Sequence, residues 1–339
     1  MEQPGEASET LRIRRISHLA TQLGISTDHL VTVAEQTRSY YREFDKVVKG
    51  KLRHLLMALE PLASLQRKIL DRILCRLSVS EHAFGAIKGR GIRDNAAEHA
   101  KAQYIAKLDI KDFYPSIRHE KVYGFFVGQE CSPDVSRILT QLTTWRYALP
   151  LGTATSPFLA DQIVHAVDGR IAGIARKHGL KYTRYVDDIT ISGDFELERI
   201  ADLIIRIVSQ AGFRVKRSKL EIYRPGDAKE RIVTGVRVDG GKLSVPRAYV
   251  DELRDDLVEA LKQSLRSSPT GEFMTRQHYL GRIGYVLWLD PPTGKDLLRI
   301  YRKVRWRHLE WAGACPGRSS TSPSALPKGT PSPANERKH

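Results

Sequence analysis

The chain has 339 residues, of which 41% are hydrophobic, as is ordinary for a soluble globular protein with two or three subdomains. Lys and Arg number 55 against 39 Asp and Glu, so the net charge is +16, which favours nucleic acid as a partner, with an anionic membrane surface as the alternative. No apolar run is long enough to span a bilayer, and the widely spaced Cys75, Cys131 and Cys315 exclude a disulfide or cysteine-metal pattern and indicate a reducing cytoplasm.

The N-terminal part is expected to be mostly helical. We predict a basic helix over Leu11–Leu23, a second helix over Thr27–Phe44, and a basic turn between extended segments at Lys49–Arg53. Pro61 then opens a long helix, because apolar residues recur at helical spacing over Leu62–Leu77.

A glycine-rich loop and a short helix follow. The segment Phe84–Ile92 carries three glycines beside Lys88 and Arg90, and such a loop lets backbone and cations approach phosphates. On the next predicted helix, Asn95 and His99 are four residues apart and therefore share one face. A structural role, in which buried backbone groups satisfy both side chains, explains this pair as well as catalysis does.

The first acidic site lies at the end of a predicted strand. The strand Tyr104–Ile110 delivers Asp109, after which the chain turns towards a helix with Asp112 and Tyr114. A two-metal nucleotidyl transferase holds two ions roughly 3.5–4 Å apart with carboxylates. Mg²⁺ combines a few carboxylates with phosphate oxygens and water. Asp112 is placed to face an incoming triphosphate through its backbone, and Tyr114 to lie beneath the sugar, where a ring excludes a 2′-hydroxyl.

The second acidic site is Tyr185–Asp188. Its flanks are rich in aromatic and β-branched residues, so the two carboxylates fall at the turn of a β-hairpin. Adjacent carboxylates repel each other, and a divalent metal ion offsets that repulsion. An ordinary polar turn is the alternative, because Asp is common in turns. Asp109 together with Asp187 and Asp188 supplies the carboxylates that such a metal pair requires.

Two further segments bear on the same chemistry. The loop Leu149–Pro157 is rich in small and hydroxyl residues and leads into a predicted helix over Phe158–Ala175, an arrangement that suits an anion, with an ordinary Ser/Pro helix start as the alternative. An amphipathic helix is predicted over Leu197–Val208. The basic stretch Phe213–Lys219 follows, where Lys219 is placed to protonate a leaving pyrophosphate, with a solvated basic loop as the alternative.

The C-terminal part combines a short hairpin with helices. The strand Ile232–Val238 is interrupted by Gly235, and helices are predicted over Pro246–Gln263 and Arg276–Leu289. The segment Arg299–Trp311 interleaves rings and cations, which suits a nucleic-acid backbone with some base stacking, whereas a packed helix with extended Arg side chains is the alternative. The candidate RNA contacts in this segment are Arg302, Arg305 and Trp306.

Taken in order, these segments resemble the motifs of reverse transcriptases, and of the bacterial retron branch in particular. The resemblance covers roughly Arg42–Pro291, and it depends on the combination of motifs more than on any one of them. The motifs are Asn95-Ala-Ala-Glu-His99, Asp109-x-x-x-Phe113-Tyr114, Leu149-Pro-x-Gly152 to Ser156-Pro157, Tyr185-Val-Asp-Asp188, Lys219 and Val233-Thr-Gly235.

The resemblance implies an α+β fold of the right-hand polymerase class, with fingers, a palm built on an antiparallel sheet, and a helical thumb. The implied divisions are an N-terminal helical extension (1–45), fingers (46–103, with part of 118–148), a palm (104–238), a thumb (239–315) and a disordered tail (316–339). The tail is also expected from its composition, because Pro, Ser, Thr and Gly dominate it.

The resemblance also implies roles for individual residues. Two Mg²⁺ ions would be held by the catalytic Asp109, Asp187 and Asp188 and by the backbone of Ile110. The implied nucleotide-binding residues are Arg53, Asp112, Tyr114, Leu151 and Lys219. The implied RNA-recognition residues are Asn95, His99, Val233, Thr234 and Gly235.

The sequence departs from the family pattern at several positions but retains all three carboxylates. Leu151 stands where Gln is usual, which removes a polar contact to the nucleotide. The other departures are Gly91 for Ser, Asp161 for Asn, Val186 for Ala, and Lys216 and Leu220 for the usual Asn and Thr around Lys219.

The implied function is that of a cytoplasmic RNA-directed DNA polymerase of a retron. Such an enzyme uses dNTPs to copy part of a cognate structured non-coding RNA into single-stranded DNA joined covalently to that RNA. It acts beside a separate effector protein in anti-phage defence, and no membrane is involved. The alternatives are a group II intron-like or untemplated abortive-infection polymerase, and a catalytically quiet RNA-binding scaffold that restrains an effector.

Overall fold

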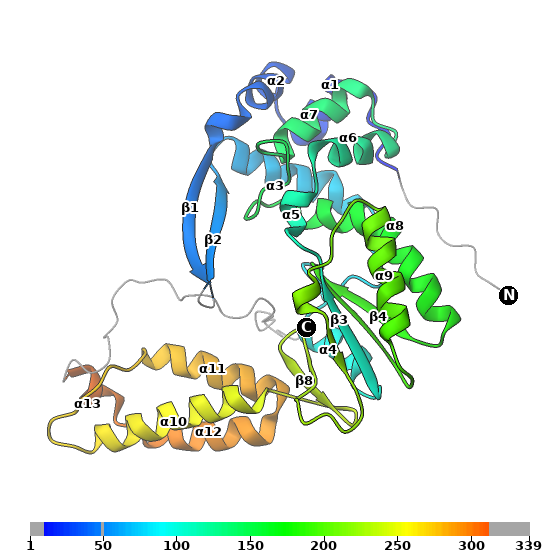
Figure 1. The fold of residues 1–339 in the computed structure, drawn as a ribbon. Helices are drawn as coiled ribbons and strands as arrows, with labels where there is room; N and C mark the ends of the chain where they lie inside the picture. The colour runs from blue at the N-terminus through cyan, green and yellow to red at the C-terminus, as the bar shows by residue number, and fades with distance from the viewer. Residues whose placement is uncertain (1–9, 49–50, 312–339) are drawn as a thin grey trace, which may run out of the picture. The chain divides into compact units, whose positions relative to one another are not determined.

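The computed structural model describes residues 10–48 and 51–311, which form two compact units. Of the described residues, those up to Arg90 and Ala106–Ile222 form the first unit, and Gly91–Ile105 with those from Tyr223 onward form the second. Figure 1 shows the elements of both, coloured along the chain. The predicted tail over 316–339 and the tip of the basic turn, at Lys49 and Gly50, lie outside the described residues.

A four-stranded sheet with strand order β4-β5-β3-β6 organises the first unit. The strands are β3 (Tyr104–Asp109), β4 (Lys181–Tyr185), β5 (Asp188–Gly193) and β6 (Glu221–Tyr223). β4 and β5 pair antiparallel with Tyr185 opposite Asp188, so the turn between them has two residues, as predicted. Both strands bury consecutive residues because helices cover the sheet, and α8 (Ser156–Lys177) packs against β4 and α9 (Glu198–Gln210) (Figure 1).

The other helices of the first unit cluster around buried leucines and isoleucines of its N-terminal segment. α7 packs against α2, α3 and α6, and its N-terminus is capped by Ser132, whose hydroxyl accepts from the amide of Val135 at 3.3 Å. These helices are α1 (Ile16–Leu23), α2 (Thr27–Glu35), α3 (Leu62–Arg72), α6 (His119–Gly128) and α7 (Pro133–Thr143), with a four-residue helix, α5 (Phe113–Ser116).

A long antiparallel hairpin, β1 (Tyr41–Val48) with β2 (Lys51–Ala58), corrects the prediction of a helix over Thr27–Phe44. The helix ends at Glu35, and a 3₁₀ turn over Thr37–Tyr40 leads into the strand. The aromatic and β-branched residues of the first strand favour an extended chain once a partner strand is present. The partner strand lies beyond the short stretch of sequence over which helical periodicity is judged. The prediction that the helix continues to Phe44 was therefore wrong.

The second unit joins a small sheet to a helical bundle. α4 (Ile92–His99) packs on a three-stranded sheet of order β7-β8-β9, and α11 and α12 pack side by side with α10 against α12. The helices predicted over 246–263 and 276–289 are present as α10 and α11. The elements are β7 (Ile232–Val233), β8 (Val236–Asp239), β9 (Lys242–Ser244), α10 (Arg247–Ser264), α11 (Arg276–Leu289), α12 (Pro291–Lys303) and α13 (Trp306–Trp311). None of the helices in the described part of the chain has the length and apolar character that crossing a membrane requires.

Candidate active site

The backbone brings the end of β3 beside the turn between β4 and β5. The amide of Ile110 donates to the carbonyl of Asp187 at 2.9 Å, and the amide of Lys216 donates to the carbonyl of Asp109 at 2.8 Å. Because β3 and β5 are also neighbours in the sheet, Asp109, Asp187 and Asp188 converge from two separate strands. The structure therefore brings together the three carboxylates that the sequence predicted to act as one set.

The proximity of these groups contributes to raised pKa values of Asp187 and Asp188. Burial, and then repulsion from Asp187 and Asp109, raise the pKa of Asp188 to about 6. Burial raises the pKa of Asp187 as well, and the charge of Asp109 adds to that rise, whereas Lys219 and Arg53 oppose it. Asp187 and Asp188 are thus harder to ionise because other carboxylates are near, and a bound cation would relieve that repulsion.

The residues present fit a hard divalent cation in their chemistry, since the donors are carboxylate oxygens and no sulfur or imidazole takes part. Among the described residues, however, His, Cys, Asp and Glu side chains do not form a ready-made metal-ligand group of three or more. Instead the Lys219 ammonium lies on the Asp109 carboxylate. Burial alone would lower the pKa of Lys219, but the hydrogen bond and charge of Asp109 outweigh it and raise that pKa. The lysine thus supplies positive charge where the prediction placed a metal ion.

Asp112 and Tyr114 lie directly after β3. Asp112 adopts a left-handed backbone conformation, with φ 48°, and its carbonyl accepts from the amide of Ser116 at 2.8 Å. Tyr114 is half-buried, and burial followed by the charge of Asp187 raises its pKa to about 12, which keeps the phenol protonated at neutral pH. Tyr114 therefore lies within electrostatic reach of Asp187, and Asp112 follows Asp109 by three residues; the contacts of both to a nucleotide stay a prediction.

The loop Leu149–Pro157 is fastened to β2. The amide of Leu56 donates to the carbonyl of Leu151 at 2.9 Å. Gly152 has φ 115°, and a Cβ at this position would lie 2.7 Å from the carbonyl oxygen of Leu56, so only glycine allows this approach. Arg53 is on the same strand, and its charge lowers the pKa of Asp187, which places it within electrostatic reach of the carboxylates. The nucleotide-binding roles of Arg53 and Leu151 stay predictions.

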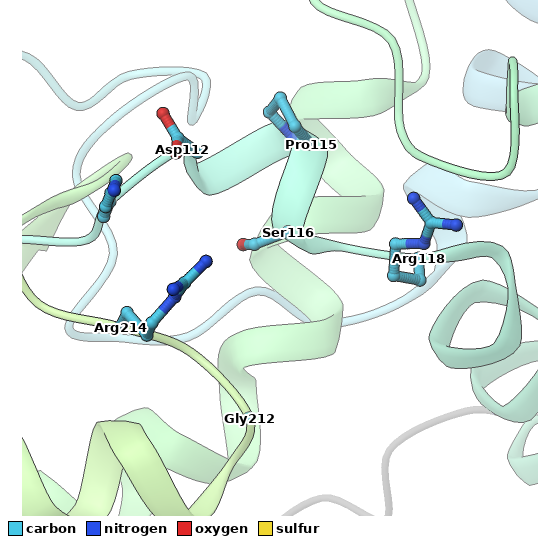
Figure 2. A pocket seen from close by; sticks show the side chains of 7 residues that line it. Asp112, Pro115, Ser116, Arg118, Gly212 and Arg214 are labelled. Atoms are coloured by element: carbon cyan, nitrogen blue, oxygen red, sulfur yellow. The ribbon is translucent and has the colours of Figure 1, made fainter.

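A basic pocket of about 350 Å³ lies next to the end of β3. The two segments that carry Lys111 and Arg214 are joined by a hydrogen bond, in which the amide of Lys111 donates to the carbonyl of Arg214 at 2.7 Å. Figure 2 shows the Arg214 side chain directed towards Ser116, with the Asp112 carboxylate turned away from it. The lining residues are Lys111, Asp112, Pro115, Ser116, Arg118, Gly212 and Arg214. A larger hollow of about 460 Å³, beside Phe195 and Glu196, contains none of the predicted site residues.

Sequence reasoning missed a buried charge cluster behind the acidic turn. Arg184 is 1% exposed, and its guanidinium donates to both carboxylate oxygens of Asp168, at 2.8 and 2.7 Å, and to Asp161 at 2.6 Å. The hydroxyl of Tyr182 donates to the same Asp168 at 2.6 Å. The available signal was an Arg inside a strand of aromatic and β-branched residues, together with two Asp seven residues apart on one face of a helix.

The predicted RNA-recognition residues of the second unit also come together. Asn95 and His99 on α4 are fully buried, and the Asn95 amide donates to the hydroxyl of Thr234 at 3.2 Å. Val233 is buried as well, whereas Thr234 is half-buried and Gly235 is exposed at the β7–β8 turn. The structure therefore places Asn95 and His99 behind this turn, and direct RNA contact stays a prediction.

The three candidates near the end of the second unit differ from one another. Arg302 and Arg305 are exposed, but Trp306 is buried between Tyr279 and Tyr301, with ring centroids 5.3 and 5.1 Å away. The Trp306 indole N–H donates to the carbonyl of Tyr301 at 3.1 Å. In this structure the Trp306 ring is part of the core, whereas the two arginines remain accessible to an anionic partner.

Comparison with known proteins identifies the class to which this fold and site belong. The chain belongs to the reverse transcriptase (RNA-dependent DNA polymerase) family, whose model matches residues 37–272. The predicted retron-type resemblance and the α+β right-hand polymerase fold class are thereby confirmed, and reverse transcriptases generally depend on divalent metal ions.

Two relatives illustrate the similarity. The retron Mx65 reverse transcriptase of Myxococcus xanthus is 34% identical over 291 residues, a match that covers 80% of this chain and 64% of that protein. The retron Ec86 reverse transcriptase of Escherichia coli is 28% identical over 294 residues, covering 85% of this chain and 88% of that protein. Among solved structures, telomerase from Candida albicans in complex with a TWJ fragment of telomeric RNA has a TM-score of 0.49 and 10% identity, over 80% of this chain and 55% of that one.

Proposed function

We propose that this protein is the RNA-directed DNA polymerase of a retron. The observation that carries the proposal is the hydrogen bond from the Ile110 amide to the Asp187 carbonyl, because it joins the strand end bearing Asp109 to the turn bearing the other two carboxylates. Membership of the reverse transcriptase family, and the retron names of its relatives, support the assignment.

In the proposed reaction a primer hydroxyl attacks the α-phosphorus of a dNTP. A P–O bond forms to the primer, the bond to the β-phosphate oxygen breaks, and pyrophosphate leaves with its electron pair. Two Mg²⁺ ions held by Asp109, Asp187, Asp188 and the Ile110 carbonyl would lower the pKa of the attacking hydroxyl and offset the charge that develops. Arg53, Asp112 and Leu151 would border the nucleotide, and the Tyr114 ring would exclude a 2′-hydroxyl. Lys219, whose ammonium contacts the Asp109 carboxylate in this structure, would be the proton donor to pyrophosphate.

The partner would be a cognate structured non-coding RNA, copied in part into single-stranded DNA that stays joined to it. The β7–β8 turn with Thr234 and Gly235 would recognise this RNA, supported by the buried Asn95 and His99, while Arg302 and Arg305 would bind its backbone. By the division that the family resemblance implies, Asn95 and His99 lie in the fingers, Thr234 and Gly235 in the palm, and Arg302 and Arg305 in the thumb. A separate effector protein and a role in anti-phage defence complete the proposal.

The test is RNA-templated primer extension by the wild-type protein and by the double variant Asp187→Asn, Asp188→Asn. We expect synthesis to fall by on the order of 10³-fold or more, because metal placement supplies several kcal/mol and each 1.36 kcal/mol is tenfold in rate. RNA binding should persist, because the second unit is unchanged. Wild-type-like extension by the double variant would contradict the carboxylate assignment.

Nucleic acid that copurifies with the protein separates the alternatives. A fixed junction between one RNA and one DNA sequence is expected for a retron, whereas DNA of random sequence would indicate an untemplated polymerase. A wild-type protein that binds RNA but extends no primer with any divalent ion would be a scaffold.

A further inference from the structure

The acidic turn has an unfavourable backbone conformation. Val186 has φ 60°, at the first position of the two-residue turn between Tyr185 and Asp188. Glycine is typical at such a position, and a β-branched residue in the left-handed region is disfavoured by contact between its side chain and the backbone. Conformations of this kind persist only where their surroundings enforce them, and they gather at functional sites.

Three contacts from the first unit enforce the conformation. The Arg184 guanidinium donates through Nη1 to the carbonyl of Val186 at 3.1 Å. The Ile110 amide holds the next carbonyl, that of Asp187, from the side of β3. Gly85 lies so close beneath the turn that a Cβ there would be 2.5 Å from both the amide nitrogen and Cγ2 of Val186. Two successive carbonyls are thus fixed by two donors, so the peptide planes on either side of Asp187 cannot rotate independently.

The Arg184 side chain is itself immobilised. Asp168 accepts from Nε and Nη2 as a two-pronged partner, and Asp161 accepts from Nη2 on the other side. The backbone of Arg184 is held as well, since its amide donates to the His82 carbonyl at 2.7 Å and its carbonyl accepts from the Phe84 amide at 2.8 Å. Only Nη1 is directed to the turn, and the remaining donors keep the planar group in place.

We infer that Arg184 is a positioning residue, which holds the Val186 carbonyl and thereby sets the direction in which Asp187 and Asp188 leave the backbone. Its effect on DNA synthesis rests on the proposed function. Its effect on cation binding by the turn does not, since it requires only that the carboxylates bind a cation.

The two acidic partners of Arg184 are not equivalent. Asp168 accepts three hydrogen bonds, from Arg184 twice and from Tyr182. Asp161 accepts one, and its other carboxylate oxygen has no hydrogen-bond partner among the described residues. Asp168→Asn therefore breaks the two-pronged contact, whereas Asp161→Asn keeps the one oxygen that Arg184 uses.

The test compares Arg184→Lys and Asp168→Asn with the matched control Arg137→Gln, which removes an exposed ion pair on α7. A lysine keeps the charge but cannot hold Asp168 and the Val186 carbonyl together. We expect kcat for primer extension to fall about 10- to 100-fold while KM for dNTP stays within about threefold, because a displaced supporting group costs this much in rate. Titration with Mn²⁺ alone, followed by electron paramagnetic resonance, should show about tenfold weaker binding in both variants and wild-type binding in the control.

A third variant separates positioning from folding. Val186→Gly suits the backbone conformation and should keep the melting temperature within about 3 °C of wild type. It should nevertheless lower kcat by about tenfold, because the turn gains freedom. The inference is overturned if folded Arg184→Lys keeps wild-type kcat and Mn²⁺ affinity, or if Val186→Gly does so where Arg184→Lys does not fold. An inactive wild-type protein whose Mn²⁺ binding still weakens with Arg184→Lys would refute the proposed function alone.

Discussion

Two hairpin turns, one in each unit, are built on the same plan but are held by different chemistry. The turn between β4 and β5 carries Val186 at φ 60°, and the turn between β7 and β8 carries Thr234 at φ 48° followed by Gly235 at φ 84°. Both place a β-branched residue in the left-handed region, where such residues are rare. Each turn is supported by side chains that lie behind it.

The supports differ in charge. The first turn is held by Arg184 inside a buried network with two carboxylates, and the second by neutral groups, the Asn95 amide and the Tyr285 hydroxyl. Burial would lower the pKa of Arg184, but its hydrogen bonds to Asp168 outweigh this and raise it, so the group stays charged. The turn that bears carboxylates is thus held by a fixed charge, while the turn proposed to meet RNA is held by weaker neutral bonds.

The largest expected effect is that of Arg184→Ala. It leaves Asp161 and Asp168 buried without their cation, and we expect the free energy of unfolding to fall by about 3–5 kcal/mol. Denaturant unfolding followed by circular dichroism measures this loss. A loss below 1 kcal/mol would mean that the network is hydrated and that the contrast between the two turns is wrong.

Gly85→Ala should have the next largest effect. The added methyl group has no space against Val186, so we expect a loss of about 1–3 kcal/mol and a lower rate of primer extension. The matched control is Gly124→Ala, since a Cβ at that helical glycine meets no atom within 4 Å. Equal stability of the two variants would show that the loop containing Gly85 can shift away from Val186 at little cost in free energy.

Asn95→Ala tests the neutral support. Thr234 loses one partner but keeps the weaker contact from its hydroxyl to the Ile92 carbonyl at 3.4 Å, and we therefore expect a loss of about 1–2 kcal/mol. RNA affinity, measured by filter binding, should fall while primer extension on a generic template continues. If RNA affinity is unchanged, the β7–β8 turn is not the recognition element.

Tyr285→Phe is expected to have the smallest effect. The hydroxyl donates to the Gly235 carbonyl at 3.4 Å, which is long for such a bond, so its removal should cost about 0.5 kcal/mol or less. Thermal unfolding at matched pH resolves this difference. A loss comparable to that of Asn95→Ala would indicate that the second turn depends on its carbonyls, as the first one does.

Local patterns in the sequence were sufficient for the acidic turn. Aromatic and β-branched residues on both sides of Asp187 and Asp188 predict two strands, and a turn is then required between them. The helices α8 and α9 were also predicted from local sequence, because the apolar residues of each helix recur within one continuous stretch. The family motifs depend on residue types at fixed spacing, which are also properties of the sequence.

Contacts between residues that are distant in the sequence could not be predicted from local patterns. The β1–β2 hairpin was predicted in part as helix, and neither the burial of the Trp306 ring nor the contact of Lys219 with Asp109 was predicted. In each case the residue type allows both states. Which arrangement forms depends on the groups that the tertiary fold brings next to the residue, and local sequence preferences do not determine those groups.

The sequence by itself determined the family, the three carboxylates and the strands and helices that carry them, because these depend on residue type and spacing. Only the tertiary structure decided that Arg184 is buried between Asp161 and Asp168 and reaches the Val186 carbonyl. The physical reason is that a charged side chain remains stable in a core only where its partners have been brought to it, and the fold alone brings them.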